Sequence, residues 1–470
     1  MTSESIAQHH AKTSSAAMNK RRTLIALMLP QLMAVANLTM VNVALPAIRE
    51  TFGAPADLMA WVVTIYMLPY VVLMPLYGRL GDDLGVRRML MLGSGVFIVG
   101  TTLNLLSQSL PLLLVGRFIQ GLGASGVVPL AIAMICRVFS EETRGRALGQ
   151  WNSIGPVASV GGSLIGGLVI DHLGWRTTFV VPIIAGLVAL YMVDQAVPAP
   201  ECQRRTATLR DFDWIGVLLL SATMAALLFY ISSRTVTGRP ALTDWRLLLV
   251  TLALLTAFVW RERRVGEPFI DLSILRVGNF RKASITSALR MVVMASFSFL
   301  TPLFLADVKG LNATVIGLIV VIRGAALFPT MYFGGRVADR WGSRRPIVLG
   351  LSVLAASILL IVLPGDGAGV TMVAIGLLVN GLGAGLALPA LHHAAMSGFD
   401  DDQGGSAAGV YSMIRFWGMM LGTACSGVLL QYLFDRGMTM LASYRIAFAY
   451  TIAVAAIGVF IAASLREEPV

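Results

Sequence analysis

The apolar residues of this chain come in blocks of about 20, a length that crosses a hydrocarbon core about 30 Å thick as a helix. Backbone groups in lipid must bond within their own segment or in a closed barrel, and the alternating pattern of a barrel strand is absent. Of the 470 residues 56% are hydrophobic and 13% charged, whereas a soluble domain carries about a quarter charged residues. The sequence therefore predicts an all-α membrane protein.

Fourteen such blocks predict fourteen transmembrane helices. We expect residues 1–22 to form a cytoplasmic tail, because no small-residue cleavage site follows the first block. Most loop arginines then lie on the cytoplasmic side, and the positive-inside rule places both termini there; Arg234 and Arg239 oppose this orientation. The net charge of +11 follows from this topology and predicts no nucleic-acid partner. The spans begin near residues 23, 58, 88, 110, 146, 175, 213, 246, 283, 313, 346, 369, 404 and 443.

Two segments repeat within the chain. Residues 78–88, Gly-Arg-Leu-Gly-Asp-Asp-Leu-Gly-Val-Arg-Arg, recur at 335–345 as Gly-Arg-Val-Ala-Asp-Arg-Trp-Gly-Ser-Arg-Arg, with 339 − 82 = 257 positions between the aspartates. Gln120 begins a Gln-Gly-Leu-Gly-Ala segment that recurs 380 − 120 = 260 positions later, at Asn380. The two spans between about 213 and 260 match neither copy. Parallel six-helix repeats predict a transporter with a substrate site between its halves.

These motifs resemble those of the major facilitator superfamily, and the inserted helix pair resembles its fourteen-helix drug:proton antiporter branch. The resemblance covers nearly the whole chain and includes residues 41–46, 61–64 and 269–276. It implies two six-helix pseudo-repeats with a central two-helix insertion. The expected division is a tail at 1–22, an N-terminal half at 23–198, a linker with two inserted spans at 199–281 and a C-terminal half at 282–470.

The resemblance also implies an activity: export of drug-like molecules or metabolites by alternating access, coupled to protons. The expected partners are a small-molecule substrate, protons and the lipid bilayer. The expected location is a plasma membrane, namely a bacterial inner membrane, and the chain is expected to act as a monomer. Two alternatives remain. The chain could export anionic metabolites or lipids, or it could be a transporter-like sensor or scaffold. An enzyme is not predicted, because no nucleophile, base and orienting group cluster in the sequence.

The repeated loop is the candidate conformational switch. Its glycines allow a tight turn, and its charged side chains can pair with neighbouring helix ends. A cluster that serves only to orient the chain in the membrane is the alternative. The resemblance links this motif to conformational switching. The candidate switch residues are Gly78, Asp82, Gly85, Arg87, Arg88, Gly335, Asp339, Gly342 and Arg344.

Three residues are candidates for proton coupling. Arg117 lies within the fourth span, where a charge has to face protein or a cavity, and it matches an arginine that the family links to proton transfer; snorkelling to the outer interface is the alternative. His392 and His393 are the only histidines in a predicted span, and histidine changes charge near neutral pH. Both could instead simply bond a neighbouring helix.

The candidate substrate cavity has arginines and no span acid. The family pattern Asp-x-Thr-x-Val-Asn aligns with Asn37 to Asn42, so an amide replaces the expected carboxylate. Arginines within spans favour anionic or strongly polar cargo, unless they bond backbone carbonyls at helix breaks. The tyrosines could line a cavity or serve ordinary packing. The predicted cavity residues are Asn37, Asn42, Tyr66, Tyr70, Gln120, Arg290, Arg323, Tyr411 and Arg415.

Small residues line the fifth span, and we expect Gly155, Gly162, Gly166 and Gly167 to allow close helix packing. The antiporter motif of the family has Gly-Pro before its final Gly-Gly, a pattern absent here. The three cysteines, Cys136, Cys202 and Cys425, lie far apart and predict neither a disulfide framework nor a metal site. No cofactor is predicted, because the dinucleotide-like glycine pattern at 121–126 lies inside a spanning helix.

Overall fold

The computed structural model describes residues 3–197, 213–266, 268–363, 369–399 and 401–466, and they are helical apart from short connections. The side chains of residues 3–19, 141, 339 and 401–406 are outside this description, as is the linker with Cys202. The helices are α1 (Ser3–Phe52), α2 (Ala56–Val72), α3 (Met74–Leu84), α4 (Val86–Leu105), α5 (Leu110–Ala124), α6 (Val127–Val138), α7 (Glu141–Leu173), α8 (Val180–Ala196), α9 (Trp214–Ile231), α10 (Ser233–Thr237), α11 (Trp245–Glu262), α12 (Gly278–Asp307), α13 (Ala313–Trp341), α14 (Arg344–Val362), α15 (Val370–Met396), α16 (Asp401–Asp435) and α17 (Met440–Ala463), with 3-10 turns η1 (Trp175–Phe179) and η3 (Leu272–Arg276).

Local capping explains where several helices begin. The side chains of Asp213, Asp244, Asn312 and Thr439 each accept a hydrogen bond from a backbone N–H in the first turn of α9, α11, α13 and α17. Such a cap satisfies one of the four N–H groups that a helix start leaves without a partner. These four helices therefore begin where a short polar side chain precedes an apolar block.

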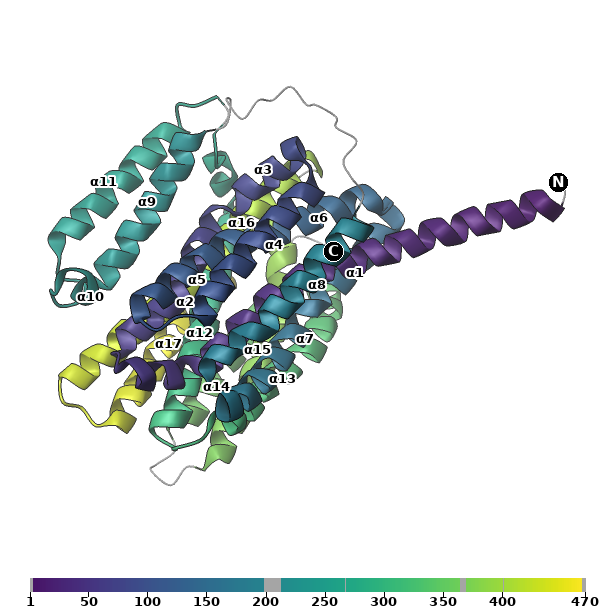
Figure 1. The fold of residues 1–470 in the computed structure, drawn as a ribbon. Coiled ribbons are helices and arrows are strands. Elements are labelled where there is room, and N and C mark those ends of the chain that lie inside the picture. The colour runs from purple at the N-terminus through teal and green to yellow at the C-terminus, as the bar shows by residue number, and fades with distance from the viewer. Residues whose placement is uncertain (1–2, 198–212, 267, 364–368, 400, 467–470) are drawn as a thin grey trace.

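Twelve helices in the described residues are long and apolar enough to cross a membrane, and the pair α2 and α3, bent by 44°, brings the count to thirteen. The predicted number was fourteen. The remaining helix, α11, carries three charged residues among its 18: Arg246, Arg261 and Glu262. The predicted tail is also continuous with the first span, since α1 begins at Ser3 and extends away from the rest of the molecule (Figure 1).

The helices form two bundles and a hairpin. Helices α1 to α8 pack on one another as the N-terminal bundle, and α12 to α17 as the C-terminal bundle. The bundles meet mainly through two helix pairs, α2 with α16 and α7 with α13. Helices α9 and α11 pair as a hairpin outside both bundles, with α9 against α2 and α16 (Figure 1). We call the end that holds Gly85 and Gly342 the motif end, and the opposite end the far end.

The same contacts occur in both bundles. Gly85 and Gly342 both have positive φ (94° and 74°) in the turn that follows the repeated aspartate, a conformation that favours glycine. Gly123 of α5 lies against the backbone of α4 at Gly93, and Gly383 of α15 lies against that of α14 at Gly350. A Cβ on any of these last four glycines would meet backbone of the facing helix at 2.9 Å or less. The sequence repeat is therefore also a repeat of helix contacts.

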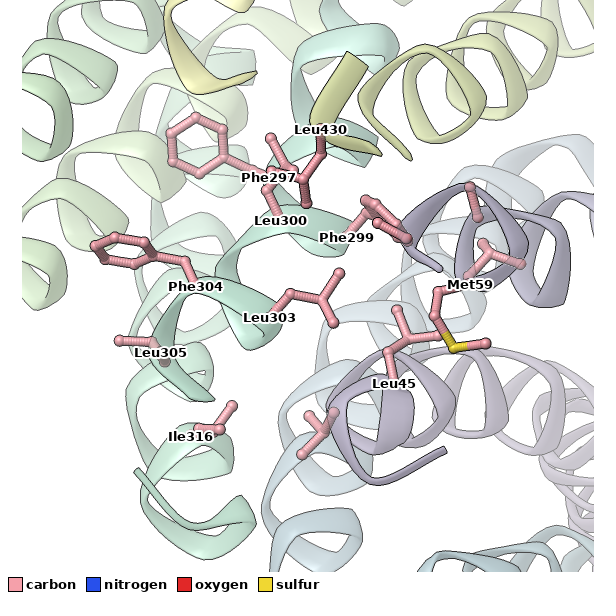
Figure 2. Close-up of a cluster of buried hydrophobic side chains, with 14 of the residues drawn as sticks. Leu45, Met59, Phe297, Phe299, Leu300, Leu303, Phe304, Leu305, Ile316 and Leu430 are labelled. Carbon is pink, nitrogen blue, oxygen red and sulfur yellow. The ribbon is translucent and has the colours of Figure 1, made fainter. Parts of the chain in front are cut away.

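The far end holds an apolar cluster that joins the two bundles. Figure 2 shows Leu45 of α1 and Met59 of α2 facing Phe299 and Leu303 of α12. All four side chains are buried. Burying side chains of this size contributes about 1.5–3 kcal/mol each in water, and here they close the space between the bundles.

Glycines of α7 bring it close to helices of both bundles. A Cβ at Gly162 would lie 2.2 Å from the hydroxyl of Thr39 on α1, and one at Gly167 would lie 2.4 Å from the carbonyl oxygen of Ala313 on α13. Gly166 lies against Met40 of α1, whereas a Cβ at Gly155 would meet nothing within 4 Å. Three of the four predicted packing glycines are thus close contacts, whereas Gly155 faces open space.

Candidate functional site between the two bundles

The contact between the bundles extends along α2 and α16 from Gly427, which lies against Ala60, to Phe416, which meets Tyr70. Along α7 and α13 it extends from Gly167 as far as Val160, which lies against Gly324. Towards the motif end, Gly155 of α7 and Gly335 of α13 have no neighbouring atom within 4 Å of an added Cβ. The bundles are therefore joined at the far end, α7 and α13 have open space beside Gly155 and Gly335, and the candidate site lies at the motif-end limit of the contact.

A buried polar network links four helices of the N-terminal bundle. Arg117 of α5 has no exposed surface; its Nε donates to the carbonyl oxygen of Val62 (2.9 Å) and its Nη1 to Gln120 Oε1 (2.6 Å). Gln120 Nε2 donates to Asn37 Oδ1 of α1 (3.1 Å) and to Thr101 Oγ1 of α4 (2.8 Å). Arg117 does not snorkel to an interface. Asn37 and Gln120, predicted in the cavity, are fully buried in this network.

An aromatic series connects this network to the C-terminal bundle. The guanidinium carbon of Arg117 lies 4.4 Å from the centre of the Tyr66 ring, which stacks on Tyr70 with 5.9 Å between ring centres. Tyr70 meets Phe416 of α16 edge to face at 5.4 Å, and Arg415 lies over the Phe416 ring at 4.9 Å. The structure thus brings both predicted tyrosines into one row. Phe416 was not predicted; its position beside Arg415 was the available signal.

Arg415 begins a second polar network in the C-terminal bundle. Its Nη1 donates to His392 Nε2 of α15 at 3.0 Å, and the His392 ring lies edge to face against Tyr411, 5.1 Å between centres. The Tyr411 hydroxyl donates to Ser287 Oγ of α12 at 3.0 Å. Arg290, one turn further along α12, is buried. Four of the predicted residues are thus close together.

The other predicted residues lie elsewhere. Arg323 donates to the Met294 carbonyl oxygen (3.3 Å) and to Ser298 Oγ (2.8 Å), so its hydrogen-bond acceptors lie on α12. Asn42 is half-buried in α1. His393 contacts Ser343 at 3.0 Å, in the turn between α13 and α14 at the motif end. The two adjacent histidines therefore occupy different environments, and only His392 touches the residues between the bundles.

The repeated loop forms ion pairs within the N-terminal bundle. Asp82 at the end of α3 pairs with Arg137 at the end of α6 (2.5 Å), and Arg87 of α4 pairs with Asp194 of α8. Gly78 and Gly335 lie inside helices α3 and α13, so only Gly85 and Gly342 among the predicted switch glycines shape a turn. The side chain of Asp339 lies outside the described residues. Arg88, also predicted in the switch, is exposed.

Asp82→Asn is expected to slow transport while leaving stability nearly unchanged. The Asp82 and Arg137 side chains are about half exposed, and such a pair contributes about 0–1 kcal/mol to folding. If the pair distinguishes two conformations, its loss should change the rate by at least about fivefold. Initial rates in proteoliposomes and thermal unfolding of the purified variant measure the two effects. A wild-type rate would exclude a switching role for Asp82.

Three polar contacts across the far end were not predicted. Arg49 of α1 pairs with Asp307 of α12 (2.5 Å), which also accepts from the Tyr444 hydroxyl (2.6 Å). Asp171 of α7 accepts from the backbone N–H groups of residues 313 and 314 at the start of α13 (3.0 and 2.7 Å). In the third, Arg234 of α10 lies between the two bundles.

Arg234 pairs with a carboxylate from each bundle. Its Nη1 lies 3.3 Å from Asp57 Oδ2 of α2, and its Nε lies 3.2 Å from Asp435 Oδ2 of α16. Gln431 extends the contact, since it donates to Asp435 and accepts from the Ala56 backbone N–H. Arg234 and Arg239 were the arginines that opposed the predicted orientation. Both have local acidic partners, because Arg239 pairs with Asp244 at 3.8 Å.

Comparisons with known proteins agree with this architecture. The family described as Major Facilitator Superfamily matches residues 27–423 and 283–470. Multidrug resistance protein Stp of Mycobacterium tuberculosis is 30% identical over 409 residues, which are 87% of this chain and 75% of that protein. Riboflavin transporter RibZ of Clostridioides difficile is 24% identical over 386 residues, 82% of this chain and 83% of that one. The crystal structure of a bacterial homologue of the human lysosomal transporter Spinster superposes with a TM-score of 0.69 at 14% identity, over 96% of this chain and 99% of that chain.

Proposed function

The chain belongs to the major facilitator superfamily and is a secondary transporter rather than an enzyme, and we propose that it exports small organic molecules by alternating access. The observation that carries this proposal is that the bundles are joined at the far end, whereas Gly155 and Gly335, towards the motif end, have open space beside them. The row from Arg117 to Arg415 crosses from the interior of the N-terminal bundle to the C-terminal bundle. Substrate would enter from the motif end and leave after the far-end contacts open.

We further propose fourteen spans, with both termini and the motif end in the cytoplasm. The charged residues of α11 lie in its first and last turns, and the stretch between them is uncharged. Exposed Trp245 and Trp260 lie near its two ends, as in the aromatic belts of spanning helices. An even number of spans leaves both termini on one side. The motif end then carries the arginines of the repeated loops, in agreement with the positive-inside rule.

Proton coupling, if it follows the resemblance, would depend on His392. Asn37 cannot titrate, and Arg117 is held by three hydrogen-bonding and ring contacts inside the N-terminal bundle. His392 is exposed and bonded to Arg415, so a change of its charge acts directly on the site between the bundles. His393 lies at the motif end of α15 and has no such contact with the site.

The test measures flux and proton movement together in proteoliposomes that contain a pH-sensitive dye. Ethidium, fluorescein and riboflavin serve as cationic, anionic and neutral probes. We expect at least one probe to cross faster than in protein-free vesicles. If protons move with it, His392→Ala should abolish the proton signal and the matched control His393→Ala should retain it. Absence of flux for all three probes would contradict export of small organic molecules, and loss of the signal in His393→Ala alone would contradict the assignment to His392.

A further inference from the structure

Three of the four arginines near the centre of the molecule, Arg117, Arg290 and Arg415, have a buried nitrogen without a hydrogen-bond partner, and Arg290 has two. Arg290 is only 3% exposed, and neither its Nε nor its Nη1 has a partner. The Nε of Arg415 is also without a partner. Arg117 lacks a partner only at Nη2, since its Nε and Nη1 donate to protein oxygens, and Arg323 donates to two oxygens of α12. Arg290, with two unpartnered nitrogens, and Arg415, which lies over the Phe416 ring between the bundles, are therefore the arginines best placed to bind a ligand.

Positive charge gathers around these free donors without an acid. Arg290 lies within electrostatic range of Arg415, Arg323 and the Tyr411 hydroxyl. Among the described residues, no Asp or Glu pairs with any of these three arginines. Like charges repel strongly in a medium of low dielectric constant, and a buried donor without a partner is costly. A bound anion would relieve both penalties.

The neighbouring side chains are suited to an anion. A guanidinium has no lone pair, so His392 Nε2 must be the acceptor in its bond with Arg415, and the His392 ring is neutral in this arrangement. The planar donors of arginine match carboxylate, phosphate or sulfonate oxygens in pairs. Tyr70 and Phe416, next to Arg415, present rings of the two bundles on which a flat apolar body could stack.

We propose that Arg290 and Arg415 form an anion-binding subsite, and that the exported cargo is an aromatic organic anion. This inference rests on the proposed transport function and names its substrate class. The acidic group would bind between the two guanidinium groups, and the ring would lie against Tyr70 and Phe416. A neutral or cationic molecule of the same shape would leave the arginine donors without partners.

An anionic cargo also accounts for Asn37 in place of a carboxylate. An inside-negative membrane potential drives anions outwards, to about a tenfold gradient for each 59 mV at one charge. Such export needs no proton carried on the first helix. The amide can then serve only the buried network with Gln120.

The experiment compares three ligands with one ring system: 2-naphthoate, 2-naphthamide and 2-naphthylmethylammonium. Their binding to the purified full chain is measured by calorimetry, and their flux is measured in proteoliposomes with an imposed potential. Wild type should bind 2-naphthoate at least about tenfold more tightly than either other ligand. Arg290→Gln and Arg415→Gln should each remove that preference, and Arg239→Gln, in the far-end loop, should retain it.

The outcomes separate the two proposals. Equal binding of the three ligands by wild type, absence of binding, or tighter binding of the ammonium would overturn the anion subsite without need of any variant. Retention of the preference in both Arg290→Gln and Arg415→Gln would overturn the assignment to these residues. Flux of the cation without anion preference would leave transport intact and reject the inference. Selective 2-naphthoate binding without flux of any ligand would support the subsite and reject export.

Discussion

Arg234→Met is expected to shift the protein towards a conformation in which the far end is open. Asp57 is 2% exposed at its side chain and relies on Arg234 as its ion-pair partner. Removal of one partner from a fully buried pair costs about 3–5 kcal/mol. Arg234 itself is 39% exposed, so about 1–3 kcal/mol is a better expectation here. That corresponds to about a 5- to 150-fold change in the ratio of closed to open far ends.

Spin labels at exposed positions Glu50 and Met438, in a cysteine-free background, would report the far-end distance. Adding Asp57→Asn to Arg234→Met removes the uncompensated charge and should restore much of the short-distance population. The matched control is Arg239→Met, because the ion pair of Arg239 with Asp244 lies within the hairpin and involves neither bundle. Unchanged distances in Arg234→Met would mean that the hairpin does not hold the far end closed.

Gly167→Ala is expected to impair transport strongly, whereas Gly161→Ala is expected to have little effect. The new Cβ at Gly167 would lie 2.4 Å from the carbonyl oxygen of Ala313, which is backbone and cannot rotate away. Overpacking of this kind costs about 1–3 kcal/mol. Because the clash lies between the bundles, the cost falls on the closed far end and not on the N-terminal bundle. A Cβ at Gly161 meets nothing within 4 Å on the same helix.

Transport rates and the same spin-label distances test this prediction. Gly162→Ala is a useful third variant, since its Cβ would clash with Thr39 and the backbone of α1 inside one bundle. It should lower the yield of folded protein, whereas Gly167→Ala should fold normally and open at the far end. Equal behaviour of Gly161→Ala and Gly167→Ala would show that α7 and α13 adjust to the added methyl group.

The sequence predicted features that depend on one helix or on an exact repeat. Block length predicted the spans, and the repeated glycine motifs predicted turns at Gly85 and Gly342. Arg117 was recognised because a charge within an apolar block requires a partner. The fourteenth span depends on α11, whose terminal charges make length and composition insufficient to count it.

The sequence could not reveal contacts between distant segments. Arg234 and Asp57 are 177 positions apart, and Arg49 and Asp307 are 258 apart. Each of these four residues lies near a helix end, where a charged side chain is expected in any membrane protein whether or not it has a partner. Periodicity shows that Asn37 and Gln120 can face inwards, but it does not distinguish a wet cavity from a buried network. It also does not separate His392 from His393, because adjacent residues differ in direction by about 100° and their neighbours come from other helices.

The repeat of helix contacts has a consequence for how such a chain can diversify. Gly121 lies on the backbone of Tyr66, and Gly381 lies on the backbone of Arg323. The two glycines are 381 − 121 = 260 positions apart and their partners 323 − 66 = 257, which are the offsets of the two sequence repeats. The ancestral duplication that such a repeat implies left two copies of each helix crossing, yet the charges differ between the copies: Arg117 has Leu377 as its counterpart (377 − 117 = 260), and Arg323 has Tyr66. We therefore expect mutations at the charged position of either copy to change selectivity while the inherited crossings keep the helices in place.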